Sequence, residues 1–500
     1  MTHYLMAIDQ GTTSSRAMIF DEQGELQVSC QKTFPQYFPN DGWVEHDGRE
    51  IIQSVMDVVR QALSKMPDGA IPAAIGITNQ RETSLIWDRN TGEPIYPAIV
   101  WQDRRTADLC RKMKEAGLEG RIAEKTGLLL DPYFSATKIK WILDNVEGAR
   151  QRAQKGELAF GTVDSFILWH LTKGAVHYTD VTNASRTMLF NIRDLSWDEE
   201  LLALFDVPAA LLPQVKACDH HFGHTDESLF GHSIPITAMA GDQQAALMGH
   251  GCFDAGQIKA TYGTGGFIMM NIGDKFVRSQ NKLLTTVAYQ IKGRVAYALE
   301  GSFFCAGSAV QWLRDGLKII ETAQETEALA RSIDNSGGVY LVPAFTGLGA
   351  PHWNPDARGA LFGLTRATGV AEIARATLES VGFQTADLLE AMQQDANLTC
   401  QSMKVDGGMV QNDWLRQFLA NVTQVEVIRP QMSETTAFGI AMLAGNTARN
   451  ITETLGNVND VSTISSYYRV TRPNVNKNAM AQQKDSWKNA VKSTCYYSKK

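Results

Sequence analysis

A short apolar segment near the start of the chain leads directly into a turn that is rich in hydroxyl side chains. Residues 4–8 are apolar, residues 9–16 read Asp-Gln-Gly-Thr-Thr-Ser-Ser-Arg, and residues 17–20 are apolar again. This pattern predicts a β-hairpin with a glycine, four hydroxyls and an arginine in its turn. Successive backbone N–H groups in such a turn form a nest that binds anions, and the carboxylate of Asp9 is suited to a cation beside that anion.

The same arrangement returns about half a chain later. Residues 257–262 predict a strand, Gly263-Thr-Gly-Gly266 predicts a turn, and residues 267–270 predict the return strand. One hairpin alone also fits an ordinary Ser/Thr-rich turn, whereas two indicate similar halves that face each other across a cleft. The chain has no Gly-x4-Gly-Lys-Ser/Thr, and no Gly-x-Gly-x-x-Gly that links a strand to a helix, which argues against P-loop and dinucleotide-binding folds.

The length of 500 residues exceeds what one hydrophobic core serves, so two or more domains are expected. Strands and helices alternate along most of the chain, which indicates an α/β fold. We expect a first domain over residues 1–250 with the first hairpin and a second over residues 251–460 with the second hairpin. Residues 461–500 form a divergent tail, expected to pack on or near the second domain.

Charge and cysteine usage exclude several classes of partner. The formal charge of −7 argues against nucleic acid or an anionic membrane as the main partner. Seven scattered cysteines without a Cys-x-x-Cys are typical of a reducing compartment, which predicts a cytoplasmic protein. No apolar stretch approaches the ~20 residues of a membrane span, and the first residues do not resemble a signal peptide.

Polar residues at the ends of predicted strands are candidates for catalytic and substrate-binding roles. Asp242 follows an apolar strand at residues 234–240, where catalytic groups gather in α/β domains, although a helix N-cap would explain it equally well. Arg81 and Glu82 follow the strand at residues 73–77 and can together bond hydroxyl groups, or they form only a surface ion pair. Trp101 is suited to stacking on a small carbon skeleton or belongs to the core.

Two glycine-rich segments could approach a ligand closely, and one His-rich segment resembles a metal site. Asp406-Gly-Gly is followed by Asn412, and residues 302–309, which include Gly307, open a predicted helix that contains Gln311. An ordinary turn or tight helix packing would explain these segments too. The His-rich segment has the residue types of a metal site but no standard zinc spacing, so a solvated loop is favoured; its members are Cys218, His220, His221, His224 and His232.

Taken together, these motifs resemble those of glycerol kinases, in the sugar-kinase family that shares the fold of actin, hexokinase and Hsp70. The resemblance runs from Leu5 to about Ala444, and the Asn-Gln-Arg-Glu-Thr run at residues 79–83 is its most specific part. It implies two ribonuclease-H-like (actin-like ATPase) domains that face each other across a catalytic cleft. The matching segments are 9–16, 42–47, 76–83, 99–102, 131–135, 182–187, 240–246, 262–265, 343–351 and 405–408.

The resemblance also implies an activity, the transfer of the γ-phosphate of ATP to glycerol, and a role for each matching residue. Asp242 would be the general base and Asp9 would organise Mg²⁺. The glycerol site would lie in the first domain and the nucleotide site in the second, and homodimers or homotetramers are expected. Glycerol would contact Arg81, Glu82, Trp101, Tyr133, Asp242, Gln243 and Phe267, and the nucleotide would contact Thr12, Thr13, Ser14, Arg16, Thr264, Gly307, Gln311, Gly408 and Asn412.

The match departs from the family at two regulatory positions. Residues 225–232 lack the glycines and the Arg of the fructose 1,6-bisphosphate loop of some bacterial members, and Ser228 replaces the phosphorylatable His of others. Neither control is therefore predicted. Two alternatives stay open: a kinase for another polyol or sugar such as xylulose or gluconate, and a nucleotide-binding switch without catalysis. The Arg81-Glu82 pair with Trp101 and Phe267 favours a small triol, and acids at positions 9 and 242 argue against the switch.

Overall fold

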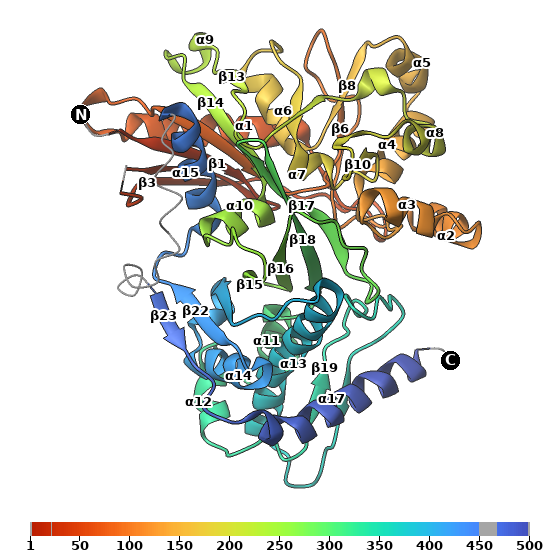
Figure 1. The fold of residues 1–500 in the computed structure, drawn as a ribbon, viewed down its shortest axis with the longest axis vertical. Helices are drawn as coiled ribbons and strands as arrows, with labels where there is room; N and C mark the ends of the chain where they lie inside the picture. The colour runs from red at the N-terminus through yellow and green to blue at the C-terminus, as the bar shows by residue number, and fades with distance from the viewer. Residues whose placement is uncertain (1–2, 22, 450–467, 499–500) are drawn as a thin grey trace.

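The computed structural model describes residues 3–21, 23–449 and 468–498, which form two large sheets stacked along the long axis of the molecule (Figure 1). The first sheet has six strands in the order β13-β14-β5-β1-β2-β3, and the second has seven in the order β17-β18-β16-β15-β21-β22-β23. The strands of the first sheet are β1 (Leu5–Gln10), β2 (Ser14–Phe20), β3 (Leu26–Thr33), β5 (Ala74–Asn79), β13 (Gly223–His224) and β14 (Pro235–Gly241). Those of the second are β15 (Ile258–Tyr262), β16 (Gly266–Gly273), β17 (Leu284–Ile291), β18 (Arg294–Phe303), β21 (Ser402–Asp406), β22 (Glu426–Pro430) and β23 (Tyr468–Thr471).

The two sheets repeat one pattern, as the paired hairpins predicted. In the first, β1 pairs with β2 antiparallel and with β5 parallel. In the second, β15 pairs with β16 antiparallel and with β21 parallel. The first turn is tighter than the predicted residues 9–16, because Asp9 pairs with Arg16 and Gln10 with Ser15 inside the ladder. Strand pairing uses backbone groups only, so polar residues extend both strands and leave residues 11–13 as the turn.

Alternate residues of β1 enter two different hydrophobic cores, because successive side chains of a strand point to opposite faces. Met6 and Ile8 pack in the core that contains Val55 of α1 (Gly48–Ser64). Leu5 and Ala7 pack in the core that contains Ala245 of α10 (Asp242–Gly249). The first sheet is therefore covered by helices on both faces.

Helix α15 (Thr435–Arg449) comes from the second half of the chain but packs on the first sheet, where Figure 1 shows it beside β1. Its contact with α10 is made by backbone atoms. A Cβ atom at Gly249 would lie 2.0 Å from the carbonyl oxygen of Thr435, and one at Gly439 would lie 2.2 Å from that of Ala245. The division of the chain at residue 250 stays a prediction, and α15 crosses it in space.

The second sheet is covered by α13 (Val370–Ala396) and α14 (Asp413–Thr423), which contact each other at Gly382. A Cβ atom there would lie 2.5 Å from the ring of Phe418, so only glycine allows this approach. In the tail, α17 (Lys477–Tyr497) stacks Trp487 on Phe383 of α13 with ring centroids 5.4 Å apart. Residues 461–467 of the expected tail lie outside the described residues.

Within the described residues, no helix combines the length and the apolar character needed to cross a bilayer.

Smaller elements follow in the chain between the strands of the two large sheets. The remaining elements are β4 (Glu45–His46), β6 (Leu85–Asp88), β7 (Ala98–Ile99), α2 (Ala107–Glu115), α3 (Glu119–Thr126), α4 (Ser135–Asn145), α5 (Ala149–Gln154), β8 (Leu158–Gly161), α6 (Val163–Leu171), β9 (Tyr178–Asp180), α7 (Val181–Ala184), β10 (Phe190–Asn191), β11 (Ser196–Trp197), α8 (Glu199–Phe205), β12 (Gln214–Lys216), α9 (Glu227–Phe230), α11 (Gly307–Gln311), α12 (Glu325–Arg331), β19 (Tyr340–Val342) and β20 (Ala360–Phe362).

Candidate active site

A buried network of four charged side chains lies between the ends of the two sheets. Arg81, just after β5, donates from Nη1 and Nη2 to the carboxylate of Glu300 over 2.7 and 2.9 Å. Arg186 donates from Nε to Glu82 over 2.6 Å and from Nη2 to Glu300 over 3.0 Å. All four side chains are at most 2% exposed, so the alternative of a surface pair for Arg81 and Glu82 is wrong.

Glu300 stays ionised in this network. Burial opposes the charged form, but Arg186 and Arg81 outweigh it and lower the pKa of Glu300 to about 2. Glu300 lies inside β18, which continues to Phe303 because Gly301 pairs with Ile268 in the ladder. The network therefore joins the first sheet to the second through buried ion pairs.

Asp242 lies beside this network at the first position of α10. Its Oδ1 is 3.3 Å from Nε of Arg81, and its side chain remains 31% exposed. Gly241 occupies the N-cap position, so the N-cap alternative for Asp242 is wrong. Burial raises the pKa of Asp242 to about 6, against the opposing charges of Arg81 and Lys259. A carboxylate with this pKa accepts protons effectively near neutral pH.

Three aromatic side chains lie together near this carboxylate and arginine. The ring of Trp101 meets Tyr133 edge-on at 5.7 Å between centroids and meets Phe267 at 6.5 Å. All three are half-buried, so Trp101 is not a core residue. Phe267 belongs to β16, and both halves of the chain thus contribute walls to one small space. Burial, reinforced by the charge of Glu82, holds the pKa of Tyr133 well above its usual range, so its hydroxyl stays protonated.

The first hairpin is connected to this aromatic group. Trp101 donates from Nε1 to Oγ1 of Thr12 over 3.0 Å. Thr13 is exposed at the turn, whereas Ser14 is mostly buried in β2 and accepts a hydrogen bond from Gln31 over 2.9 Å. Arg16 donates to Asp9 over 2.6 Å and to Glu434 over 2.7 Å. The predicted phosphate contacts of this hairpin therefore lie beside the predicted acceptor site.

The second hairpin is tied to the start of α11. The carbonyl oxygen of Thr264 accepts from the backbone nitrogens of Ala306 and Ser308 over 2.8 and 3.1 Å. The nitrogen of Gly307 donates to Gly263 over 2.9 Å, and a Cβ atom at Gly307 would lie 2.7 Å from that same oxygen. Glycine at position 307 thus allows the helix to approach the hairpin turn. Gln311 is exposed at the end of α11.

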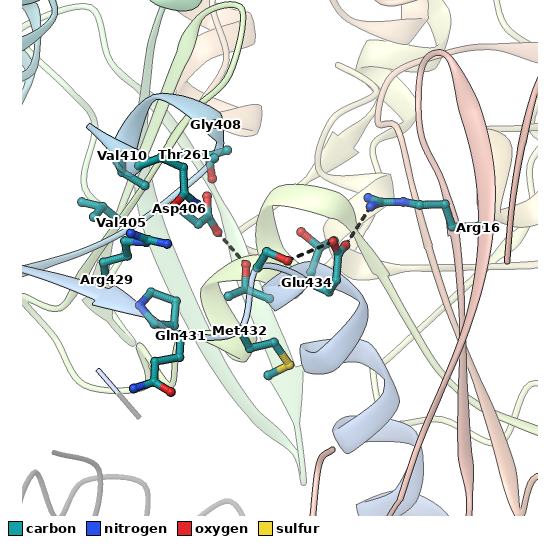
Figure 2. Close-up of a pocket in the computed structure, with 16 residues that line it drawn as sticks. Arg16, Thr261, Val405, Asp406, Gly408, Val410, Arg429, Gln431, Met432 and Glu434 are labelled. Carbon is teal, nitrogen blue, oxygen red and sulfur yellow. Dashed lines mark hydrogen bonds and ion pairs between the residues drawn. The ribbon is translucent and has the colours of Figure 1, made fainter. Parts of the chain in front are cut away.

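A cavity of about 360 Å³ separates predicted nucleotide residues of the two halves. Arg16 from the first hairpin and Gly408 after β21 both line it, and Figure 2 shows Arg16 directed toward Glu434 at the start of α15. Asp406 lies on the same wall, where it accepts from Thr435 over 2.6 Å and bonds His250 over 2.8 Å. Asn412 lies further along, where its Oδ1 caps α14 by accepting from the nitrogen of Leu415.

Comparison with known proteins places the chain in a family. The model of the FGGY family of carbohydrate kinases matches with its N-terminal domain over residues 4–249 and with its C-terminal domain over residues 258–448. The chain belongs to the FGGY family of carbohydrate kinases. The expectation of an α/β sugar-kinase fold of the actin-like type is thereby confirmed.

Several members of the FGGY family are close in sequence or structure. Glycerol kinase 1 of Pseudomonas aeruginosa is 57% identical over 496 residues, which cover 98% of this chain and 99% of that protein. A glycerol kinase of Ectopseudomonas mendocina is 61% identical, with 89% and 90% of the chains covered. The structure of Plasmodium falciparum glycerol kinase with ADP superposes with a TM-score of 0.93 at 34% identity, covering 99% of this chain and 98% of that one.

Three buried charged residues of this FGGY kinase were missed as site residues in the sequence. Arg186 lies in the Asn-Ala-Ser-Arg segment that resembles the family, and Glu300 lies inside β18; the sequence around neither residue indicates its charged partner. Lys259 lies inside the second hairpin, is fully buried, and donates to Oε1 of Gln243. The sequence of β15 does not indicate that the side chain of Lys259 points into the interior of the protein.

The His-rich segment is divided in space. Cys218 is fully buried and donates from Sγ to Asp180 over 3.3 Å, whereas His221 and His224 are exposed with ring centroids 4.8 Å apart. In the part of the chain that the structure describes, there is no group of three or more His, Cys, Asp or Glu side chains that could hold a metal ion.

Proposed function

We propose that this chain is a glycerol kinase that transfers the γ-phosphate of ATP to glycerol and yields sn-glycerol 3-phosphate and ADP. One observation carries the proposal: Asp242 lies 3.3 Å from Arg81 within a small site walled by Trp101, Tyr133 and Phe267, next to two phosphate hairpins. The names of relatives at 57% and 61% identity support it.

In this proposal the acceptor side binds a small triol. Arg81, Glu82, Tyr133, Asp242 and Gln243 bond its hydroxyls, and Trp101 and Phe267 contact its carbon skeleton. Asp242 takes the proton from the attacking hydroxyl, which needs only a modest base because that proton leaves late in a loose transition state. Most of the rate then comes from the alignment of hydroxyl and phosphate.

The nucleotide side uses the two hairpins. Thr12, Thr13, Ser14 and Arg16 of the first and Thr264 of the second contact the phosphates, with backbone N–H groups of both turns completing the nest. The rest of the nucleotide is framed by Gly307, Gln311, Gly408 and Asn412. Arg16 is already held between two carboxylates, Asp9 and Glu434, so phosphate binding has a preoriented cation.

Mg²⁺ fits the residues at this site. The ion is commonly held by one or two carboxylates together with substrate phosphates, so it needs no complete protein cage. Asp9 offers a buried carboxylate at the end of β1, and burial raises its pKa although Arg16 opposes this. Asp9 would hold the ion, directly or through water. When bound, Mg²⁺ spreads the charge of the β- and γ-phosphates.

The proposal also includes location and assembly. A cytoplasmic location is supported by the seven cysteines, all of which are free thiols. A homodimer or homotetramer is proposed from the resemblance to the family alone.

A substrate panel tests the proposed function. Glycerol, xylulose and gluconate are offered separately with ATP and Mg²⁺, and ADP release is followed in a coupled assay. We expect ADP release with glycerol and background release with the other two, because Arg81 and Glu82 together with Trp101 and Phe267 suit a small triol. Equal rates with glycerol and xylulose would contradict the substrate assignment. No turnover with any acceptor, despite nucleotide binding, would favour a non-catalytic switch.

A further inference from the structure

Lys259 connects the second hairpin to the acceptor site. It lies in β15, is fully buried, and donates from Nζ to Oε1 of Gln243 and, over 3.1 Å, to Oγ1 of Thr261. Gln243 belongs to α10 in the first half of the chain, immediately after Asp242. One ammonium group therefore joins the hairpin that carries Thr264 to the helix that carries the proposed base.

The chemistry of the two groups fixes the orientation of the amide. A lysine ammonium has three donors and no acceptor, so only the oxygen of Gln243 can face it. The Nε2 group of Gln243 must then point away from Lys259 and remains a donor. A substrate hydroxyl that accepts from Nε2 keeps its own proton free to be donated to the carboxylate of Asp242.

Lys259 also acts on Asp242 by its charge. It faces Asp406 of β21, Asp242 of α10, Glu300 of β18 and the guanidinium of Arg81. Burial lowers the pKa of Lys259 and Arg81 adds to this, whereas the three carboxylates favour its charged form. In the other direction, the charge of Lys259 lowers the pKa of Asp242 against the effect of burial.

We propose that Lys259 is a positioning residue of the acceptor site: it orients the amide of Gln243 so that Nε2 donates to a substrate hydroxyl, and its charge keeps the neighbouring Asp242 ready to accept that hydroxyl's proton. This inference rests on the proposed function. It predicts that Lys259 acts on the acceptor through Gln243 and not through the nucleotide.

The first experiment is a double-mutant cycle with Lys259→Met and Gln243→Ala, measured on glycerol and ATP. Lys259→Met should lower kcat/KM for glycerol by roughly tenfold or more and leave the KM for ATP within about twofold, because the half-buried amide of Gln243 loses its fixed partner. The double variant should fall no further than the worse single variant. Effects that multiply in the double variant would overturn the proposal.

A pH profile separates positioning from mere structural support. Loss of the Lys259 charge should move the acid limb of kcat/KM for glycerol to higher pH, since the pKa of Asp242 rises without it. Lys404→Met is the matched control: Lys404 is the registered neighbour of Lys259 on β21, but its Nζ donates to the backbone oxygen of Gly251 and to that of His250. Its acid limb should stay in place. An unmoved limb in Lys259→Met would contradict the proposal.

A second variant tests the orientation of the Gln243 amide even if Lys259→Met does not fold. Gln243→Glu keeps an oxygen facing Lys259 and gives that buried ammonium a counter-charge, but it replaces the Nε2 donor by an acceptor. We expect a loss of kcat/KM for glycerol of roughly tenfold or more with the fold retained. Unchanged glycerol kinetics in Gln243→Glu would overturn the inference. Failure of the wild-type chain to phosphorylate glycerol would instead overturn the proposed function.

Discussion

Arg81 and Glu300 form a bidentate ion pair, with nitrogen–oxygen distances of 2.7 and 2.9 Å, that joins the end of β5 in the first sheet to β18 in the second. Both side chains are almost completely buried. In such surroundings a charge without its partner is costly, because water does not replace the lost interaction. The relative placement of the two sheets at the site therefore depends on this pair.

Glu300→Gln should destabilise the folded chain. The change leaves Glu82 as the one buried carboxylate shared by Arg81 and Arg186, and we expect the free energy of unfolding to fall by about 3–5 kcal/mol. Chemical denaturation followed by circular dichroism measures it. Asp315→Asn is the control, because Asp315 pairs with Arg314 at the exposed surface and its loss should leave stability unchanged. Equal stability of both variants would contradict a structural role for Glu300.

Asp242→Asn should abolish most of the activity and preserve the fold. Loss of the proposed general base should lower kcat by roughly 10²–10⁴-fold. Burial raises the pKa of Asp242 from 3.8 to about 6 in the folded state, so the unfolded chain ionises first and stability falls as the pH rises from about 4 to about 6. The side chain is partly exposed, so the neutral variant should gain only about 1 kcal/mol at pH 8. Steady-state kinetics and thermal unfolding check both outcomes, and unchanged turnover would remove the base.

The same carboxylate predicts the pH dependence of the wild-type enzyme. The protonated form of Asp242 cannot accept the hydroxyl proton, and its pKa is about 6. We expect kcat/KM for glycerol to fall about tenfold per pH unit below that value. Circular dichroism at each pH shows whether the chain is still folded. Activity that stays constant down to pH 5 in a folded enzyme would contradict this assignment.

Lys138 should make stability depend on alkaline pH. It is buried in α4, donates to the carbonyl oxygens of Glu82 and Tyr133 over 3.1 and 2.7 Å, and burial lowers its pKa from 10.5 to about 7, although the nearby carboxylates of Glu82, Asp103 and Asp131 oppose this. Between pH 7 and pH 10.5, Lys138 is protonated in the unfolded chain and mostly neutral in the folded one. Unfolding free energy should therefore rise with pH, by up to about 1.4 kcal/mol per unit.

Lys138→Met should remove this rise, and Lys140→Met should retain it. Lys140 lies on the same helix but pairs with Asp144 over 3.0 Å nearer the surface. Denaturation curves at several pH values from 7 to 10 compare the slopes. Parallel curves for wild type and Lys138→Met would show that the ammonium is charged in the folded state throughout.

Gly439→Ala should weaken the contact between α10 and α15. The added Cβ would lie 2.2 Å from the carbonyl oxygen of Ala245, so the two helices must move apart. Overpacking of this kind costs about 1–3 kcal/mol. Gly120→Ala in α3 is the control, because its Cβ would meet only the end of the Arg278 side chain at 3.8 Å and alanine favours helix by about 0.5–1 kcal/mol. Equal melting temperatures would show that the helices adjust freely.

Local signals in the sequence were enough to predict both hairpins and most strands and helices near them. The hairpins combine apolar alternation with turn residues, and these act between near neighbours in the chain. The exact turn was less predictable, because Asp9 and Ser15 favour a turn by type and are nevertheless held in a ladder by their backbones. The resemblance to a family then joined segments that local patterns could not connect.

Pairings between distant charged residues could not be predicted in this way. Arg81 and Glu300 are separated by 219 positions, and neither residue type is normally buried. Lys259 is likewise buried because α10 packs over β15. The sequence of β15 alone cannot predict this contact. Cys218 was placed in a solvated loop by its polar neighbours, yet the structure directs its thiol inward to Asp180.

The position of α15 governs how a newly made chain can mature. The β-strands of the first hairpin are synthesised before α15, which covers one of their faces together with α10. During translation this apolar face stays partly exposed until residues 435–449 have been made, and a nonsense codon shortly before residue 435 would remove most of its cover. Expression of the first half by itself should accordingly yield inclusion bodies.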